Sequence, residues 1–468
     1  MFMKKRLLSG IAILCVFSSL DLASGQTAKS PGDPAEADVR AMLTDRLVPG
    51  TDTGMVVGLI AKGNSRIIAA GKSGAAGSPA PGGDTIFEIG SATKVFTTTL
   101  LAIMAERGEV RLEDPAAQYL PSSVKVPERN GRKITLLDLA THQSGLPRLP
   151  TNLNPRDPAN PYADYTVEQL YAFLSGYQLP RDIGAQFEYS NLGMGLLGHI
   201  LSLKAGIGYE ALVTRLVLEP LQMKDTGITL RPGQSERFAQ GHDSAGRAVA
   251  AWDLPTLAGA GALRSTVQDM LKFAAANLAG TGPLATALRS THQARAGIGT
   301  PDGSVALGWL LRHAFDTEIV WHNGGTAGFH SFIGFDLKNG AAVVILHNSA
   351  ASIDDIGFHL LDSRFPIVKP PSAPKPRKET VVAAAILDSY VGQYQLAPAF
   401  VMTVTRTGEQ LFIQATGQAR LPVFAESQTD FFYKVVDAQV TFIKDANGQV
   451  TGLILHQGGR DTPGRKVK

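Results

Sequence analysis

The central segment of this sequence reads Phe87-Glu88-Ile89-Gly90-Ser91-Ala92-Thr93-Lys94-Val95-Phe96, and a largely apolar run continues from it to Gly108. Gly90 permits a tight turn, Ser91 stands where an N-cap residue stands, and Gly108 stands where a C′ glycine ends a helix. The pattern predicts a buried helix that opens on Ser91. Residues three apart lie on one face of a helix, so Lys94 is expected within a turn of Ser91.

A serine beside a lysine places a nucleophile beside a base. Burial in an apolar helix lowers the pKa of a lysine amine toward the range where the neutral amine accepts a proton at pH 7. The backbone N–H groups at the helix N-terminus suit an oxyanion that develops on an attacked carbonyl. A Ser-x-x-Lys match also occurs by chance in long chains, so the assignment of Ser91 and Lys94 depends on partner motifs.

Two later segments supply candidate partners. Tyr189-Ser190-Asn191 precedes an apolar helical pattern, and it combines a possible proton relay with an amide that both donates and accepts hydrogen bonds. His322-Asn323-Gly324-Gly325 follows a strand pattern, where glycines let a substrate approach the backbone closely. A histidine at a strand end either donates a hydrogen bond to a carboxylate or caps the strand without a chemical role. Each segment is weak evidence by itself.

The N-terminus carries the pattern of an export signal. A basic stretch, Met1–Arg6, precedes the short apolar run Leu7–Phe17, and cleavage near Ala23-Ser24-Gly25 fits the pattern. A retained membrane anchor is the alternative, although the run is shorter than the ~20 residues of a membrane span. A periplasmic or secreted protein with no stable span after cleavage is therefore expected. The formal charge of +3 comes largely from this leader, which argues against a nucleic-acid partner.

The single cysteine, Cys15, lies inside the predicted signal. The mature chain would then have no thiol, which excludes disulfides, thiolate zinc sites and a cysteine nucleophile. No cofactor and no metal are predicted.

Strand patterns occur early and late in the first domain, with helical patterns between them. The predicted strands are Met55–Ala61, Ser65–Ala70, Ile319–His322, Ser331–Phe335 and Ala341–Leu346. The predicted helices are Glu36–Leu47, Thr166–Tyr177, Leu192–Ala205, Gly208–Val217 and Ser265–Leu278. This order predicts an α/β fold in which an antiparallel sheet, assembled from both ends of the domain, is flanked by helices. Pro150–Tyr165 is rich in Pro, Asn and Asp and is expected to wall a substrate cleft.

A proline-rich segment, Val368–Arg377, has the composition of a stiff linker. Short strand patterns separated by turn residues follow it at Val401–Thr405, Leu411–Ile413, Phe431–Val435, Val440–Ile443 and Val450–Leu455. They predict a small antiparallel β sandwich or barrel. The expected organisation is a signal peptide over residues 1–25, a first domain over 26–367, a linker over 368–384 and a β domain over 385–468.

The three motifs, in this order and at these separations, resemble those of the serine β-lactamase and penicillin-binding DD-peptidase superfamily. The motifs are Ser91-x-x-Lys94, Tyr189-x-Asn191 and His322-x-Gly324. The surrounding segments Ile134–His142 and Leu263–Met270 look like those of the class C branch. The resemblance covers about residues 35 to 360. It implies an α/β sandwich beside an all-α lobe, with the site between them. The β domain resembles the lipocalin-like C-terminal modules of some relatives.

The resemblance also implies catalytic roles. Ser91 would be the acylated nucleophile and Lys94 its proton acceptor. Tyr189 would relay a proton to the leaving nitrogen and then serve the deacylating water. The backbone N–H groups of Ser91 and Gly325 would form the oxyanion hole.

The remaining motif residues would bind substrate. Asn191 would hold the amide carbonyl of the substrate, and His322, with Asn323 and Gly324, would help to bind its carboxylate. Class C β-lactamases usually have Lys-Thr-Gly where this chain has His322-Asn323-Gly324. A mostly neutral histidine predicts weaker attraction for a β-lactam carboxylate than a charged lysine gives.

The resulting hypothesis is an exported serine acyl hydrolase that is acylated on Ser91 by D-alanyl peptides or β-lactams. An esterase or a D-aminopeptidase on the same site is the alternative among enzymes. A non-enzymatic penicillin-binding sensor is the alternative from another class, and the intact Ser, Lys and Tyr argue against it. The expected partner is a small-molecule or peptide substrate.

Overall fold

The computed structural model describes residues 34–74, 79–368, 377–397, 400–416, 420–434, 438–457 and 460–467. The chain forms two compact units that divide at residues 369 and 370, and we call them the N-terminal and the C-terminal unit. The predicted signal peptide and most of the proline-rich segment lie outside the described residues.

The N-terminal unit combines a large sheet with many helices. Its α-helices are α1 (Glu36–Arg46), α2 (Thr93–Glu106), α3 (Leu136–Ala140), α4 (Val167–Gly176), α5 (Asn191–Ala205), α6 (Tyr209–Val213), α7 (Ala258–Gly261), α8 (Val267–Ala279), α9 (Ala285–Thr291) and α10 (Asp354–Leu361). Its strands are β1 (Gly54–Ala61), β2 (Asn64–Gly71), β3 (Phe87–Glu88), β4 (Glu128–Arg129), β5 (Arg132–Lys133), β6 (Arg264–Ser265), β7 (Ala296–Gly297), β8 (Gly303–Val305), β9 (Leu310–Ala314), β10 (Thr317–Gly325), β11 (His330–Asp336) and β12 (Ala341–His347). Four short turns of other helix types are η1 (Gly90–Ala92), η2 (Ala116–Tyr119), η3 (Thr214–Leu218) and η4 (Ser235–Arg237).

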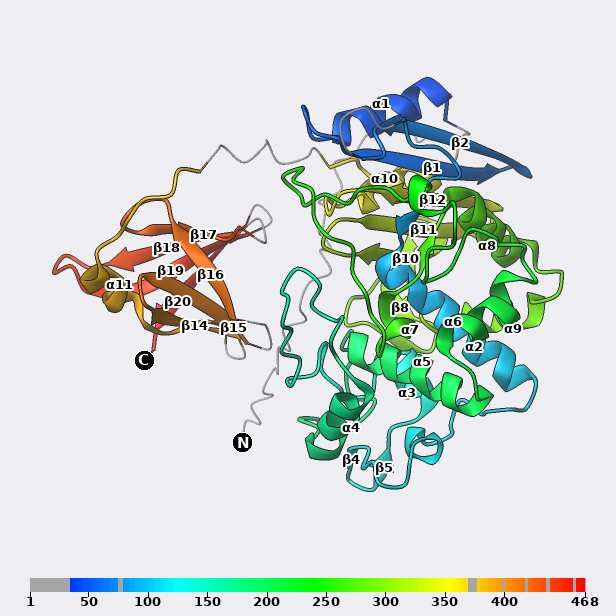
Figure 1. The fold of residues 1–468 in the computed structure, drawn as a ribbon, viewed down its shortest axis with the longest axis horizontal. Helices are drawn as coiled ribbons and strands as arrows, with labels where there is room; N and C mark the ends of the chain where they lie inside the picture. The colour runs from blue at the N-terminus through cyan, green and yellow to red at the C-terminus, as the bar shows by residue number, and fades with distance from the viewer. Residues whose placement is uncertain are drawn as a thin grey trace, which may run out of the picture. The chain divides into compact units, whose positions relative to one another are not determined.

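Eight strands form one sheet in the order β2-β1-β12-β11-β10-β9-β8-β7 (Figure 1). The early strand β1 pairs antiparallel with the late strand β12, and Met55 faces His347 in the register. The first six residues of β1 are buried, as expected for a strand that is covered on both faces. The predicted antiparallel sheet from both ends of the domain is confirmed.

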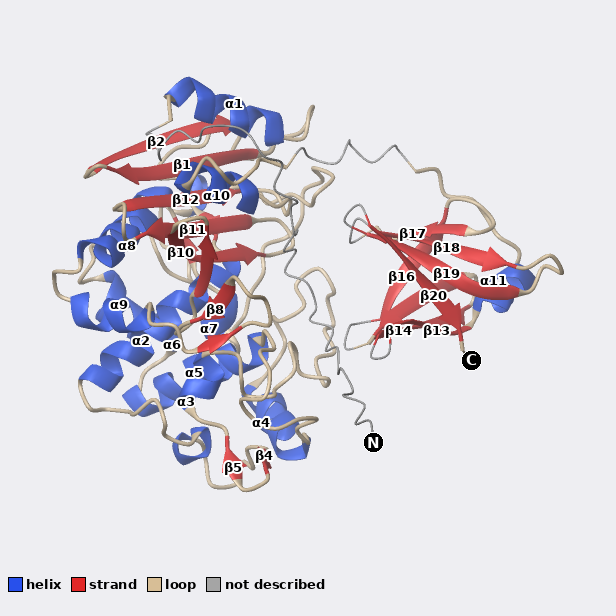
Figure 2. Ribbon diagram, turned by 180° about the vertical axis from the view of Figure 1, so that it is seen from behind, coloured by secondary structure: helices blue, strands red, loops and turns tan. Residues whose placement is uncertain are grey.

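Helices cover both faces of this sheet (Figure 2). On β11, alternate residues face opposite ways, so Phe332 and Gly334 meet α10 whereas Ile333 joins the core that α8 also enters. On β1, a methyl group at Gly58 would lie 2.6 Å from Val267 Cγ1, so glycine allows α8 to pack closely there.

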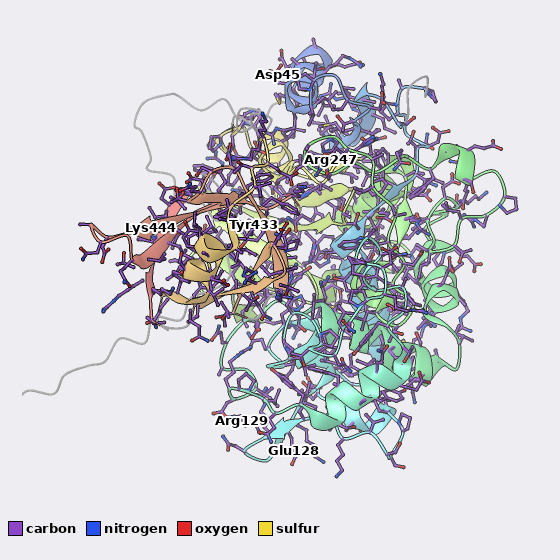
Figure 3. The ribbon with its side chains drawn as sticks, turned by 60° about the vertical axis from the view of Figure 1, so that its left-hand side comes forward. Asp45, Glu128, Arg129, Arg247, Tyr433 and Lys444 are labelled. Carbon is purple, nitrogen blue, oxygen red and sulfur yellow. The ribbon has the colours of Figure 1, made fainter. Side chains whose placement is uncertain are left out.

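A helical lobe extends from the sheet and contains α3, α4, α5, α6 and α7. The hairpin β4–β5 lies at the far end of this lobe, where Glu128 and Arg129 point outward (Figure 3). Helix α2 begins at the sheet, since η1 contacts β10 and β11, and it then packs against α5 and α7 of the lobe. The predicted burial of α2 is confirmed, because every residue from Thr93 to Met104 is buried.

Local capping explains several helix boundaries. Thr166 and Thr266 cap α4 and α8 by accepting hydrogen bonds from the backbone three residues ahead. The prediction that Ser91 caps the next helix is wrong, because a turn of 3₁₀ helix, η1, precedes α2 and its N-cap is Ala92, which has no side-chain cap. The helix predicted over 208–217 is divided into α6 and the π-helical turn η3.

The C-terminal unit is a closed, antiparallel, eight-stranded barrel. It comprises α11 (Ala384–Tyr390), β13 (Gly392–Ala397), β14 (Phe400–Thr407), β15 (Gln410–Ala415), β16 (Arg420–Ala425), β17 (Asp430–Phe432), β18 (Ala438–Lys444), β19 (Val450–Gln457) and β20 (Arg460–Lys466). The predicted β fold is confirmed, although β13, β16 and β20 were not predicted. The last strand contains Pro463 and Gly464, residues that usually argue against a strand.

The barrel has a core of its own. Tyr390 at the end of α11 is fully buried and stacks on Phe442 with ring centroids 4.0 Å apart. The hydrophobic core of the C-terminal unit is separate from that of the N-terminal unit. Each unit therefore has the burial that independent folding requires.

Deleting residues 378–468 should leave a soluble N-terminal unit that still hydrolyses a small ester, because no core residue of that unit is removed. Thermal unfolding and esterase assays on the truncated protein measure this. A longer deletion from Asp354, which also removes α10, should be insoluble since it uncovers one face of the sheet. If the shorter deletion also destroys solubility, the two units depend on each other for folding.

In the part of the chain that the structure describes, no single helix meets the length and hydropathy requirements of a membrane span. One bent pair, Asn191–Ala205 with Tyr209–Leu218, meets them together, with a bend of 77°.

Candidate active site

Ser91 lies on η1, at the start of α2 and against the end of β10. Gly90 has φ 49°, a left-handed conformation, and a methyl group on it would lie 2.8 Å from the backbone nitrogen of Gly325. Both the conformation and the close approach therefore require glycine at position 90. The turn leaves Ser91 half-buried, whereas Lys94 is fully buried.

The amine of Lys94 is held by three oxygens. Its Nζ lies 2.9 Å from Ser91 Oγ, 2.9 Å from Asn191 Oδ1 and 2.7 Å from the carbonyl oxygen of Ala260. Burial, and then the charge of Arg148, holds the pKa of Lys94 well below its ordinary value of 10.5. A neutral amine at hydrogen-bond distance from a hydroxyl has the geometry of a general base and its nucleophile.

We expect kcat/KM for a neutral ester to fall as the pH falls through the lowered pKa of Lys94, because the protonated amine cannot accept the Ser91 proton. Activity should therefore already be maximal well below pH 10.5. Arg148→Ala should move this acid limb to higher pH, since it removes a charge that lowers the pKa. Arg107→Ala, at the opposite end of α2, is the matched control. A rate that climbs until about pH 10.5 would exclude Lys94 as the base.

Tyr189 lies among basic and aromatic groups. Its ring centroid is 4.8 Å from Lys94 Nζ and 5.1 Å from the guanidinium carbon of Arg148. The ring of His142 lies 4.5 Å away, and that of His322 lies 6.2 Å away. Tyr189 and Lys94, both predicted to be catalytic, thus lie next to each other, as the transfer of a proton between them would require.

Asn191 is the first residue of α5, and Ser190 caps this helix by accepting a hydrogen bond from the Gly193 N–H. Asn191 Oδ1 accepts from Lys94, which leaves the amide NH₂ group to donate to a carbonyl. Burial raises the pKa of Tyr162, a residue of the segment 150–165 that was expected to wall a cleft, and the nearby Arg148 and Asn191 oppose this rise.

His322 is buried and neutral. Burial, and then the nearby Lys94, lowers its pKa to about 3. Its Nδ1 lies beside the carbonyl oxygen of Asn323, so Nδ1 carries the proton, and Nε2 is an acceptor without a hydrogen-bond partner among the described residues. The histidine therefore provides neither a charge nor a donor for a substrate carboxylate.

Gly324 and Gly325 bring β10 into contact with η1. A methyl group on Gly324 would lie 1.9 Å from the carbonyl oxygen of Ile89 and 2.9 Å from the Ser91 nitrogen, so only glycine fits there. Gly325 has open space around its α-carbon. The N–H groups of Ser91 and Gly325 were predicted to form an oxyanion hole. The two backbone segments that carry them, η1 and the end of β10, thus lie in contact at the nucleophile.

The side chain of Asn323, predicted to bind substrate, is not part of this cluster. Successive side chains of a strand point to opposite faces, so Asn323 points away from the face of His322. Its Nδ2 donates to Asp354 Oδ2 on α10 at 2.6 Å, and the same carboxylate lies 2.9 Å from His330 Nε2. This amide therefore fixes α10 to the sheet.

Two residues at the site, His142 and Arg148, were not predicted as functional, and Tyr162 was predicted only as part of the segment Pro150–Tyr165. His142 has φ 58°, is buried, and its Nδ1 accepts a hydrogen bond from the Ser190 N–H. Burial, and then the charge of Lys94, lowers its pKa well below the ordinary value. His142 ends the segment Ile134–His142 that resembles the class C branch, whereas Arg148 lies in the loop that follows, and loops commonly carry binding residues.

Within the described residues, no group of three or more His, Cys, Asp or Glu side chains is arranged to hold a metal ion.

Most of the chain is similar to known proteins. A family model described as Beta-lactamase matches residues 43–359, and a Domain of unknown function (DUF3471) matches residues 376–466. The D-alanyl-D-alanine-carboxypeptidase/endopeptidase AmpH of Escherichia coli (strain K12) is 29% identical over 396 residues, which cover 79% of this chain and 100% of that protein. A Beta-lactamase of Pseudomonas fluorescens is 28% identical, over 57% of this chain and 80% of its own.

Solved structures show the same fold. A class C beta lactamase from Rhodobacter sphaeroides has a TM-score of 0.58 at 26% identity, covering 68% of this chain and 94% of its own. A Beta-lactamase/D-alanine Carboxypeptidase from Yersinia pestis has a TM-score of 0.61 at 23% identity, covering 70% of this chain and 97% of its own.

Proposed function

The chain belongs to the beta-lactamase family and is a serine acyl hydrolase, and from this premise we propose that it is acylated on Ser91 by D-alanyl peptides or β-lactams and then hydrolyses the acyl-enzyme. The observation that carries the assignment is the buried Lys94 amine, 2.9 Å from Ser91 Oγ. The named relatives act on D-alanyl-D-alanine or are beta-lactamases, which supports this choice of substrate class.

In the proposed acylation, Lys94 Nζ takes the proton of Ser91 as Oγ attacks the substrate carbonyl carbon. The N–H groups of Ser91 and Gly325 stabilise the resulting oxyanion. When the tetrahedral intermediate collapses, the bond to the leaving nitrogen breaks, and Tyr189 delivers to it the proton that Lys94 had taken. Asn191 donates a hydrogen bond to the carbonyl on the acyl side of the substrate.

Deacylation uses the same groups in the reverse roles. Tyr189, next to the Lys94 amine, takes a proton from a water molecule that attacks the acyl-enzyme carbonyl. The bond to Ser91 Oγ then breaks, and the proton returns to that oxygen, which regenerates the enzyme.

An esterase is a second candidate, and the state of His322 favours it. A neutral imidazole without a donor toward the site gives no attraction for the carboxylate on the leaving-group side of a D-alanyl peptide or a β-lactam. A neutral ester does not use such attraction.

A panel of four substrates tests the proposal: a chromogenic cephalosporin, a D-alanyl-D-alanine peptide, D-alanine p-nitroanilide and p-nitrophenyl acetate. Turnover of either of the first two supports the proposal. Turnover of the acetate alone indicates an esterase, and turnover of the anilide indicates a D-aminopeptidase. A stable penicillin adduct with no turnover of any substrate would indicate a sensor.

Export to the periplasm or the medium is part of the proposal. It is supported by the basic and apolar N-terminal leader. Fractionation of cells that express the full chain, with N-terminal sequencing of the mature protein, tests it.

A further inference from the structure

Arg148 is an unpaired arginine at the candidate site. It lies on the loop that follows α3, its side chain is exposed, and its guanidinium carbon is 5.1 Å from the Tyr189 ring centroid. In the described parts of the chain, its guanidinium has no hydrogen bond and no ion pair. Arg129 and Arg132, by comparison, pair with Asp182 and Asp138.

Burial disfavours the charged forms of the other basic groups of the site, whereas Arg148 is exposed and supplies its charge. Burial lowers the pKa of Lys94, His142 and His322. Among the described residues, Asp354 is the one carboxylate that acts on the pKa of any of these three groups, and it lies beyond the opposite face of β10. A guanidinium, in contrast, stays charged in proteins, and it binds a carboxylate through two parallel hydrogen bonds.

The backbone of Arg148 is held at the start of α5. The carbonyl oxygen of Arg148 accepts hydrogen bonds from the N–H groups of Asn191 and Leu192, at 3.0 and 3.2 Å. Arg148 is thereby fixed beside Asn191, the proposed partner of the acyl-side carbonyl. The charge of Arg148 also opposes the rise that burial causes in the pKa of the nearby Tyr162.

We propose that Arg148 is a specificity-determining residue that binds a carboxylate on the acyl part of the substrate, beside the carbonyl held by Asn191. The inference rests on the proposed function, and it goes further by naming the preferred acyl donor: a D-alanyl compound whose N-acyl group ends in a carboxylate. The carboxylate of such a substrate would pair with the guanidinium of Arg148. His322, in contrast, supplies no charge that would bind an anion on the leaving-group side.

The test compares two acyl donors of the same shape. N-succinyl-D-alanine p-nitrophenyl ester carries a terminal carboxylate, and N-succinamoyl-D-alanine p-nitrophenyl ester carries a neutral amide in its place. We expect the full-length enzyme to prefer the succinyl ester in kcat/KM by about tenfold, the usual value of one charge-assisted hydrogen bond. Arg148→Ala should bring the ratio of the two kcat/KM values close to one, and Arg148→Lys should retain part of the preference.

The ratio of kcat/KM for the two D-alanyl esters distinguishes a role of Arg148 in anion binding from a general effect of Arg148 on catalysis. If Arg148 acts only through Tyr189 or Lys94, its replacement changes both rates equally, and the unchanged ratio overturns the inference. Arg107→Ala removes an exposed charge at the far end of α2 and should keep the wild-type ratio. A wild-type enzyme that hydrolyses p-nitrophenyl acetate but neither D-alanyl ester refutes the proposed D-alanyl specificity itself, and the inference with it.

Discussion

Replacing Ser91 by alanine should lower the turnover of every ester or amide substrate by at least about a thousandfold, the usual cost of removing a nucleophile. It should also abolish covalent labelling by a fluorophosphonate or a penicillin, because the acyl-enzyme forms on that oxygen. The variant should still fold. Lys94 keeps Asn191 Oδ1 and the Ala260 carbonyl oxygen as acceptors when the hydroxyl is lost.

Intact-mass spectrometry after incubation with the probe measures the adduct, and initial rates measure the turnover. Ser202→Ala is the matched control, because among the described residues its hydroxyl bonds only to the Gly198 carbonyl oxygen, one turn back on α5. That variant should label and turn over like the wild type. An adduct of unchanged yield on Ser91→Ala would show that another residue is the nucleophile.

Gly324→Ala should cost about a hundredfold in kcat/KM and about 1–3 kcal/mol of stability, because the added methyl group overlaps two backbone atoms. It would lie 1.9 Å from the Ile89 carbonyl oxygen and 2.9 Å from the Ser91 nitrogen. Neither atom belongs to a flexible side chain, so β10 and η1 have to separate. The separation would move the Gly325 N–H away from the nucleophile.

Gly325→Ala is the stability control for this experiment, because a methyl group there meets no atom within 4 Å. Its Tm should stay near that of the wild type, while the Tm of Gly324→Ala falls. If both variants unfold at the wild-type temperature and Gly324→Ala keeps its activity, the contact between β10 and η1 does not position the nucleophile.

The sequence predicted the parts of the site that local chemistry determines. Ser91 and Lys94 are three residues apart on one helical stretch, so their proximity follows from helix geometry alone. Tyr189, Asn191 and His322 are distant in sequence, and only the family resemblance placed them together. The main strands were predicted because β-branched and apolar runs are long there, as in Ala341–Leu346.

Other features depend on tertiary contacts that no local pattern encodes. The sequence around Ser91 resembles a helix N-cap, but Ser91 lies instead in a 3₁₀ turn. This turn packs closely against Gly324 through Ile89, a contact between segments distant in sequence. Asn323 adjoins two motif residues, yet strand alternation directs its side chain to Asp354. Arg148 was missed because its position depends on two hydrogen bonds to the start of α5, made by a loop without regular structure.

The pairing of β1 with β12 has a consequence for how the protein is made. Gly54 N donates to Asn348 Oδ1 across 294 residues of chain. The hairpin of β1 and β2 emerges from the ribosome long before β12 does, so the other edge of β1 stays open during most of the synthesis. The entropy of closing so long a loop opposes early pairing, and such high contact order is typical of slow folding. An apolar strand with an unpaired edge readily pairs with other chains. We therefore expect nascent and prematurely terminated chains to aggregate more readily than the full-length chain.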